Sequence, residues 1–381
     1  MCAKLAHMAE LDERALGARI REARERAALK QGELGALVGL ERTAVNKIEG
    51  GVRKVTALEL SDIASVLGVR MSSFLAGPVP ALVSHRSSQG LDTADSKIDR
   101  LLASIAADVE FVHSLAAEEL GLPADEGETL QRPSTLADAD HLALQVRDLL
   151  GMDARSPLHD LVDRTASIGL LTFSRDLGVD TADAGTILLR HGAVSLVNSR
   201  NKVGRRRLAL AHELGHYLVA DEYTIDWRVT DLPSGGDIES RLDRFARALL
   251  LPEPGLTAAW DQHRARDLRE TAVVLASEFR VDMATLARRL EELSLVDRDG
   301  AFLIRGTTTT RADIVDLGLF VPMDLEGTSL PLPYQKAVLR AFRDEQISQE
   351  RALELLHDTF AEDDLPSLRP RREDEIWNFV S

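Results

Sequence analysis

The chain has 381 residues, a formal net charge of −16 and 44% hydrophobic residues, a composition that is ordinary for a folded protein of two or three domains. Cys2 is the only cysteine, which excludes an internal disulfide and a cysteine-based metal site and indicates a reducing compartment. No apolar run approaches the length of a membrane span, and the N-terminus lacks the apolar core of a signal peptide, so we expect a soluble, cytoplasmic protein with no membrane partner.

The charge is distributed unevenly along the chain. Residues 1–80 carry 12 Lys and Arg against 10 Asp and Glu, whereas the remainder carries 34 against 52. The acidic remainder would repel phosphate backbones, so a nucleic-acid contact belongs to the first eighty residues.

Residues 11–76 have the pattern of several short amphipathic helices. The first has an apolar stripe, and we expect its four arginines, Arg19, Arg21, Arg24 and Arg26, to be exposed. Gln31–Val38 and Glu41–Glu49 follow as two helices joined through Gly39. Two short helices joined by a glycine turn are typical of a helix-turn-helix, whose second helix enters the major groove.

Four segments of this region, 31–35, 42–53, 58–60 and 67–69, resemble the Xre/Cro repressor type of helix-turn-helix. The resemblance implies a five-helix domain that binds double-stranded operator DNA, commonly as a homodimer, and hence association with the nucleoid. It also implies which side chains meet DNA: bases and phosphates would be contacted by Arg42, Thr43, Asn46 and Lys47, and the backbone by Gln31 and Arg53. Such modules also occur as dimerisation domains alone.

The next segments read as connections. Residues 77–95 are rich in Pro, Ser and Gly without an apolar period, which predicts a linker. Residues 96–150 follow as a helical connector, and the long amphipathic helix at 96–122 is a candidate for pairing with a second copy of the chain. A second helix is expected at 135–150.

The middle of the chain changes to a mixed pattern. A helix at 158–168 precedes short strands at 169–174, 184–190 and 193–198, with a hairpin turn at 190–192. The basic run at 205–207 then leads into the next helix, and we expect it to form a solvated face, with steering of an acidic substrate or single-stranded nucleic acid as the alternative.

One ten-residue stretch, Leu210–Val219, carries a recognisable chemical pattern. His212 and His216 are four residues apart among helically spaced leucines, so both imidazoles leave one helix face about a turn apart and can share a metal ion. Glu213 follows the first histidine, where its carboxylate can take a proton from water activated by the metal. Gly215 is unfavourable within a helix unless a neighbouring element packs closely against it.

A catalytic zinc site needs a third protein ligand. The helix at 237–252 supplies two candidates, Glu239 and Asp243, which lie one turn apart and are both eligible on geometry.

The two segments together resemble the ImmA/IrrE family of metallopeptidases, over residues 158–295. The match comprises Ala-His-Glu-Leu-Gly-His at 211–216 and then Glu239, Asp243, Phe245, Ala246, Leu250 and Pro252; Leu242 replaces the usual alanine. The resemblance implies a gluzincin-like minimal zinc peptidase domain, with one Zn²⁺ per chain on His212, His216 and Glu239 and with Glu213 as general base. It further implies a protein substrate of the repressor or antitoxin kind, cut in a stress, DNA-damage or phage-related response, with single-stranded DNA as a candidate activator.

The remaining features carry less chemistry. Three polar side chains are candidates for oxyanion support: Tyr217, Tyr223 and His263. Residues 296–381 predict a helical region without an assigned role, with a short strand at 301–304 and helices at 333–343 and 348–360. The expected fold is therefore mostly α with a small β-sheet (α+β).

Two functions of different classes fit this pattern. The first is a DNA-binding regulator with an active zinc endopeptidase, which cuts a partner or itself. The second is a non-proteolytic repressor or antitoxin whose peptidase fold senses a ligand or holds a partner.

Overall fold

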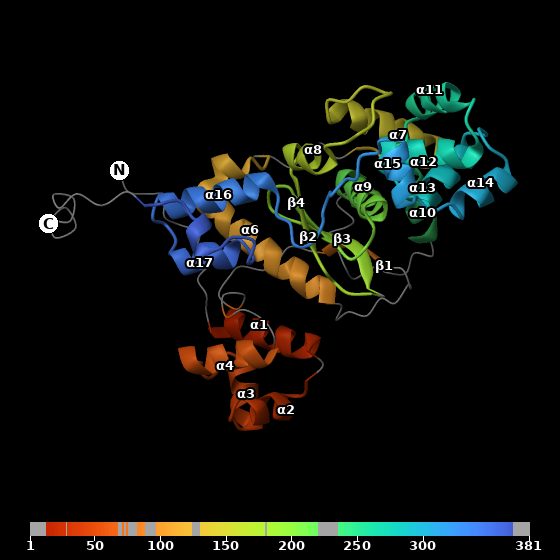
Figure 1. The fold of residues 1–381 in the computed structure, drawn as a ribbon. Helices are drawn as coiled ribbons and strands as arrows, with labels where there is room; N and C mark the ends of the chain where they lie inside the picture. Colours follow the sequence, from red (N-terminus) through yellow and green to blue (C-terminus); the bar gives the residue numbers. More distant parts are fainter. Residues whose placement is uncertain are drawn as a thin grey trace.

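The computed structural model describes residues 13–27, 29–67, 71, 74, 82–87, 97–123, 130–179, 181–219 and 235–368. These residues form a mostly helical structure with a small mixed sheet, which confirms the α+β class (Figure 1). None of the helices in these ranges has the length and apolar character that crossing a bilayer requires.

The N-terminal helices enclose a small core of their own. They are α1 (Glu13–Arg26), α2 (Gln31–Leu37), α3 (Arg42–Glu49) and α4 (Ala57–Leu67). Their apolar faces meet at the buried side chains Ile20, Leu34, Val45, Ile48 and Ile63. Gly39 turns the chain between α2 and α3 with a φ of +68°, a conformation that glycine adopts without strain. Of the expected fifth helix the structure describes only Met71 and Phe74, and Phe74 is buried in the same core.

One of the four arginines expected on the exposed face of α1 is buried instead. Arg24 is only 7% exposed, and its Nε donates to Oε1 of Glu49 on α3 at 2.6 Å. The guanidinium can be buried beside the apolar stripe of α1 because α3 places the buried Glu49 carboxylate against it. The pair joins α1 to the second helix of the helix-turn-helix.

The sheet has four strands in the order β1-β3-β4-β2. They are β1 (Leu82–Ser87), β2 (Leu170–Arg175), β3 (Ala182–Leu188) and β4 (Ala193–Asn198). Strand β2 is parallel to β4, and the other neighbours are antiparallel. The structure thus confirms the three strands and the hairpin expected in the middle of the chain.

The fourth strand was not expected, because β1 lies within the segment predicted to be a linker. It pairs antiparallel with β3, from Leu82 opposite Ile187 to Ser87 opposite Ala182. An edge strand is held by backbone hydrogen bonds to one neighbour, so it needs no apolar period of its own. This is why the composition of residues 77–95 did not reveal it.

Helices cover both faces of the sheet (Figure 1). On one side, α8 (Leu161–Ser167) and α9 (Val203–Val219) pack against the strands. Four further helices share the core of this side beyond α9: α7 (Leu136–Leu149), α10 (Gly235–Leu250), α12 (Leu268–Glu278) and α13 (Met283–Glu292). The other face packs against α6 (Lys97–Leu120), α16 (Leu332–Arg343) and α17 (Gln349–Leu355). Short helices complete the first side: α11 (Glu253–His263), α14 (Arg298–Arg305) and α15 (Arg311–Asp316).

Helix α6 buries the apolar stripe that we expected to pair with a second copy. Leu102, Ile105 and Val109 are at most 2% exposed and share a core with Ala337 and Val338 of α16. The C-terminal helices supply the surface that the sequence alone could not identify, so this stripe is not available to a second chain.

Two further expectations are corrected by the side-chain environment. Residues 301–304 belong to helix α14 and not to a strand: Ala301 and Ile304 are buried while Phe302 and Leu303 are 73% and 62% exposed, which is helical spacing. The basic run at 205–207 lies within α9 and does not form a solvated face, because Arg205 is exposed but Arg206 and Arg207 are buried. Arg207 is fully buried and donates to the carbonyls of Leu158 and His159 and to Asp324, so it fixes α9 to the chain around it.

Candidate metal centre

Helices α9 and α10 approach each other closely at Gly215. A Cβ atom at that position would lie 2.9 Å from Cδ1 of Phe245 and 3.1 Å from Cδ2 of Leu242, both on α10. Any larger residue would therefore push the two helices apart. The glycine is explained by this contact, as the sequence indicated, and the contact sets the distance between the side chains of the site.

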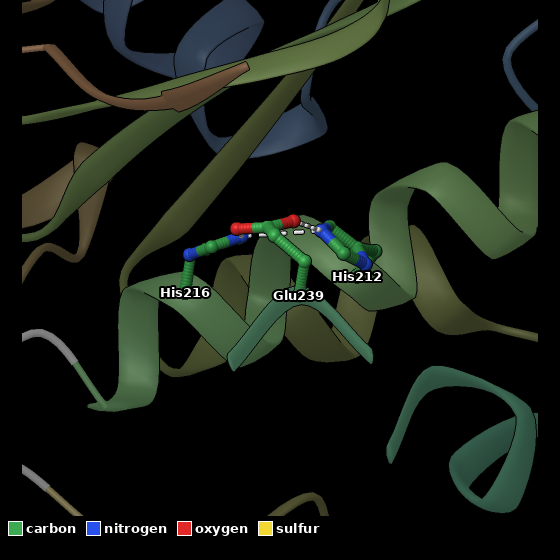
Figure 2. A group of neighbouring side chains, drawn as sticks. All are labelled: His212, His216 and Glu239. Carbon is green, nitrogen blue, oxygen red and sulfur yellow. Dashed lines mark hydrogen bonds and ion pairs between the residues drawn. The ribbon is translucent and has the colours of Figure 1, made fainter. Parts of the chain in front are cut away.

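Three side chains converge across this helix pair (Figure 2). His212 and His216 leave α9 with their Nε2 atoms 3.1 Å apart. Glu239 of α10 lies between them: Oε2 is 3.1 Å from Nε2 of His212, and Oε1 is 3.3 Å from Nε2 of His216. The ligand-type atoms of the three residues all lie within 4.8 Å of one another.

Asp243, the other carboxylate eligible on geometry, takes a different place. Its Oδ1 lies 3.0 Å from Nδ1 of His212, on the side of the ring opposite Nε2. A carboxylate there favours the tautomer with its hydrogen on Nδ1, which leaves the lone pair of Nε2 for a metal ion. The structure therefore separates the two candidates: Glu239 joins the cluster, and Asp243 orients one of its imidazoles.

Glu213 is fully buried, and neither of its carboxylate oxygens has a hydrogen-bond partner among the described residues. Burial raises its pKa, and the nearby imidazoles of His216 and His212 and the Thr186 hydroxyl oppose that rise. An unpaired buried carboxylate is costly unless a cation or water completes its surroundings. The position of Glu213 next to the two histidines indicates that such a cation or water would lie between the three side chains.

A row of buried hydroxyl side chains lies in the sheet beneath α9. Thr186 of β3 is opposite Ser195 of β4, which is opposite Thr172 of β2, and all three are at most 1% exposed. Thr186 is the member of this row whose hydroxyl opposes the rise in the pKa of Glu213. We did not identify these residues from the sequence; the signal that could have found them is a hydroxyl at the centre of each of three apolar strands.

The electrostatics of the cluster are those of a cation site. Burial would lower the pKa of His212, but its contacts with Asp243 and Glu239 raise it to about 9. Burial would likewise raise the pKa of Glu239, but its contacts with His212 and His216 hold it well below its usual range. Positive charge is therefore favoured between these side chains, whether a proton or a metal ion supplies it.

The donor set fits zinc. Two imidazole nitrogens and one carboxylate oxygen are the protein ligands of many catalytic zinc sites, which keep a further position open. The Glu239 side chain is 52% exposed whereas that of His212 is 2% exposed, so the cluster is buried on one side and reachable on the other. The charge balance, the donor types and the unpaired Glu213 together support a metal ion at this position.

Of the three candidates for oxyanion support, the structure describes Tyr217 and His263, and neither belongs to the metal-type cluster. The Tyr217 hydroxyl donates to the carbonyl of Ile168 at 3.0 Å, and burial raises its pKa, so its hydrogen is already engaged by the backbone. His263 ends α11, outside the three-residue cluster. Tyr223 lies outside the described residues.

The six residues expected to contact DNA lie on or beside α2 and α3. Arg42, Thr43, Asn46 and Lys47 are all exposed on α3. Nε2 of Gln31 lies 3.3 Å from Oδ1 of Asn46, which places the start of α2 beside α3. Arg53 forms a 2.6 Å ion pair with Glu59.

Comparison with known families gives two matches. Residues 168–291 match the model described as an IrrE N-terminal-like domain, and residues 15–71 match a helix-turn-helix domain. No curated protein matches the chain. The first match contains all the metal-site residues, and the second contains all six expected DNA contacts.

Proposed function

The chain thus joins a helix-turn-helix DNA-binding domain to a domain of the IrrE-like peptidase family, and we propose that it is a transcriptional regulator with an active zinc-dependent endopeptidase. The observation that carries the proposal is the position of Glu213. It is a fully buried carboxylate without a hydrogen-bond partner among the described residues, and it lies next to His212 in a helix whose two histidines, with Glu239, are suited to zinc. A site that served only to hold a metal for stability would not need this fourth, unpaired carboxylate.

The residues of the chain would divide the chemistry as follows. His212, His216 and Glu239 would hold the zinc ion, and Asp243 would keep the His212 ring in the tautomer that binds it. When bound, zinc supplies the Lewis acidity that activates water and polarises a peptide carbonyl. Glu213 would accept the proton of the attacking water and return it to the leaving amine. Burial raises the pKa of this carboxylate, which makes it a stronger base for the first transfer.

The helix-turn-helix domain supports a role at DNA. The exposed guanidinium, hydroxyl, amide and ammonium groups of α3 are suited to base edges and phosphates of a double-stranded operator. We further propose that the substrate is a protein regulator of the repressor or antitoxin kind, and that the protein acts at the nucleoid in the cytoplasm. The two domains in one chain would then place proteolysis at the site of transcriptional control.

The test compares three forms of the full-length, zinc-loaded chain against the product of the neighbouring gene, with and without single-stranded DNA. Wild-type protein and the exposed control Glu253→Gln should cut it, and Glu213→Gln should not, as judged by mass spectrometry of the fragments. Cleavage by Glu213→Gln at the wild-type rate would remove Glu213 from the mechanism. Operator regulation by Glu213→Gln equal to that by wild type would instead favour the non-proteolytic sensor or partner-holding function.

A further inference from the structure

Strand β1 connects two parts of the molecule that the sequence separates. It lies between the helix-turn-helix domain and the peptidase-like domain along the chain, yet it is the edge strand of the peptidase-like sheet. All of its pairing in the sheet is with β3, in antiparallel register. A short segment from outside the family-matched region thus completes the sheet beside the site.

The pairing and the packing place β1 beside the helix that carries the proposed general base. Ser84 of β1 is the register partner of Thr186 of β3, and Thr186 belongs to the row of buried hydroxyls beneath α9. Both β1 and β3 also pack beside α9, which carries Glu213 and the two histidines. The backbone around Ser84 and His85 therefore runs along the sheet edge that packs against α9, the helix of the two histidines.

A peptidase must hold its substrate in an extended form so that one carbonyl can be presented to the metal. The common way for a sheet to hold an extended peptide is strand addition, in which backbone hydrogen bonds supply affinity. Strand β3 has β4 on its inner side, so its outer side is the place where a peptide strand could be added beside α9, which carries Glu213. That side is where β1 lies.

We propose that the outer edge of β3 is the binding site for an extended peptide segment of the substrate, and that residues 82–87 of the same chain occupy this site in competition with it. The inference rests on the proposed function for the identity of the substrate. It adds that a substrate must displace β1, so the segment joining the two domains restrains the site.

The test measures binding and not cleavage, with the full-length chain carrying Glu213→Gln so that no peptide is consumed. The probe is a fluorescent synthetic peptide of residues 81–88, and its affinity is followed by fluorescence anisotropy. Replacing residues 82–87 with three Gly-Ser repeats keeps the length of the connection but removes its strand propensity. This chain should bind the peptide at least ten-fold more tightly than the Glu213→Gln parent, because the tethered competitor is gone.

Two proline variants form a matched pair within β1. In an antiparallel strand the amides of successive residues point alternately toward and away from the partner, so only one of Ser84→Pro and His85→Pro removes a hydrogen bond to β3. The variant that loses the hydrogen bond to β3 should bind the probe more tightly than the parent. It should also bind the probe more tightly than the other proline variant does. Equal enhancement by both, or by neither, would contradict pairing of β1 in this register.

A second probe tests the mode of binding. The same peptide methylated on every backbone nitrogen has no N–H donor on either edge and carries a methyl group in place of each, so it should not bind the Gly-Ser chain. Equal affinity of the parent and the Gly-Ser chain for the unmodified peptide would overturn the proposal, as would equal binding of the methylated peptide. Because the Glu213→Gln background makes no cleavage, these outcomes are independent of whether the wild-type protein proves to be a peptidase.

Discussion

Two carboxylates one helical turn apart on α10 illustrate how much depends on single side chains. Glu239 lies within 3.3 Å of the Nε2 atoms of both histidines, whereas Asp243 lies 3.0 Å from Nδ1 of His212. The proposed function makes the first a metal ligand and the second a group that orients one. Their similar chemistry makes them a natural pair of controls for each other.

We expect the two carboxamide substitutions to differ in kind. Glu239→Gln removes the charged ligand and should abolish stable zinc binding. Asp243→Asn leaves all three ligands and should weaken zinc binding by roughly ten- to a hundred-fold while one ion still binds at saturation. Titration against a chromophoric chelator measures both affinities. The reverse order would make Asp243 the third ligand.

At the scale of elements, the spacing of α9 and α10 is set by Gly215. In Gly215→Ala the added methyl group would lie 2.9 Å from Cδ1 of Phe245, a side chain that is fully buried. We expect the helices to separate, so that zinc affinity falls although alanine favours the helix by about 1 kcal/mol. Chelator titration tests this, with Gly215→Ala,Phe245→Leu as a variant in which the smaller side chain should restore part of the affinity. Unchanged affinity in Gly215→Ala would show that the contact does not set the site.

A second inter-element contact predicts acid sensitivity. Asp140 of α7 binds Arg244 of α10 at 2.7 Å and Arg289 of α13 at 2.8 Å, and Arg289 is buried. Despite partial burial, these two arginines hold the pKa of Asp140 below its usual 3.8. A carboxylate whose pKa is lower in the folded than in the unfolded chain stabilises the folded state at pH values above its unfolded pKa. This stabilisation is lost as the pH falls through the folded pKa.

Asp140→Asn should therefore lower the free energy of unfolding by about 1–3 kcal/mol at pH 7, since a buried cation loses its partner. The difference from wild type should shrink below about pH 4, where the wild-type carboxylate also becomes neutral. Urea denaturation at pH 7 and at about pH 3 measures it. Asp148→Asn, an exposed change on the same helix, should have little effect at either pH. A pH-independent difference would contradict the assignment to this charge.

The elements differ in how far the sequence could predict them. Helix α9 and its two histidines, strands β2 to β4 and the helix-turn-helix follow from local patterns, because apolar spacing and ligand spacing are local properties. The buried positions of Arg24 and Arg207 do not, because each depends on a distant acceptor, Glu49 or Asp324, that only the fold brings near.

The same reasoning explains the remaining differences. An apolar stripe on α6 predicts a partner but not its identity, and the partner is α16, more than two hundred residues later in the chain. Strand β1 is fixed by pairing with β3, which the composition of a Ser-rich segment does not indicate. The third candidate ligand could be predicted only in part. The spacing of the sequence left Glu239 and Asp243 as alternatives, and the family resemblance favoured Glu239. The packing of α9 against α10 then places Glu239 at the Nε2 atoms of both histidines and Asp243 at Nδ1 of His212.

At the scale of the whole molecule, the chain joins a slightly basic N-terminal part to a strongly acidic remainder. The excess of Asp and Glu after residue 80 would keep DNA away from the peptidase-like domain and direct it to α3. The apolar stripe of α6 is buried within the chain, so it is not the surface through which two copies would pair.

We expect the full-length protein to bind a palindromic site near its own gene with an affinity that falls steeply as salt rises. Lys47→Ala should reduce the slope of log affinity against log salt by about 1, because one phosphate contact is lost. Asn46→Ala should weaken the specific site by about 1–3 kcal/mol with little change in slope. Gel-shift titrations at several salt concentrations give both quantities, and salt-insensitive binding would contradict the proposed phosphate contacts.

The claim on which the rest depends is that His212, His216 and Glu239 hold one zinc ion beside Glu213. Metal analysis of purified wild-type, Glu213→Gln and His212→Ala proteins tests it most directly. We predict about one zinc per chain in the first two and almost none in His212→Ala. Zinc retained in full by His212→Ala, or absent from wild-type protein purified without chelator and supplied with zinc, would contradict the account.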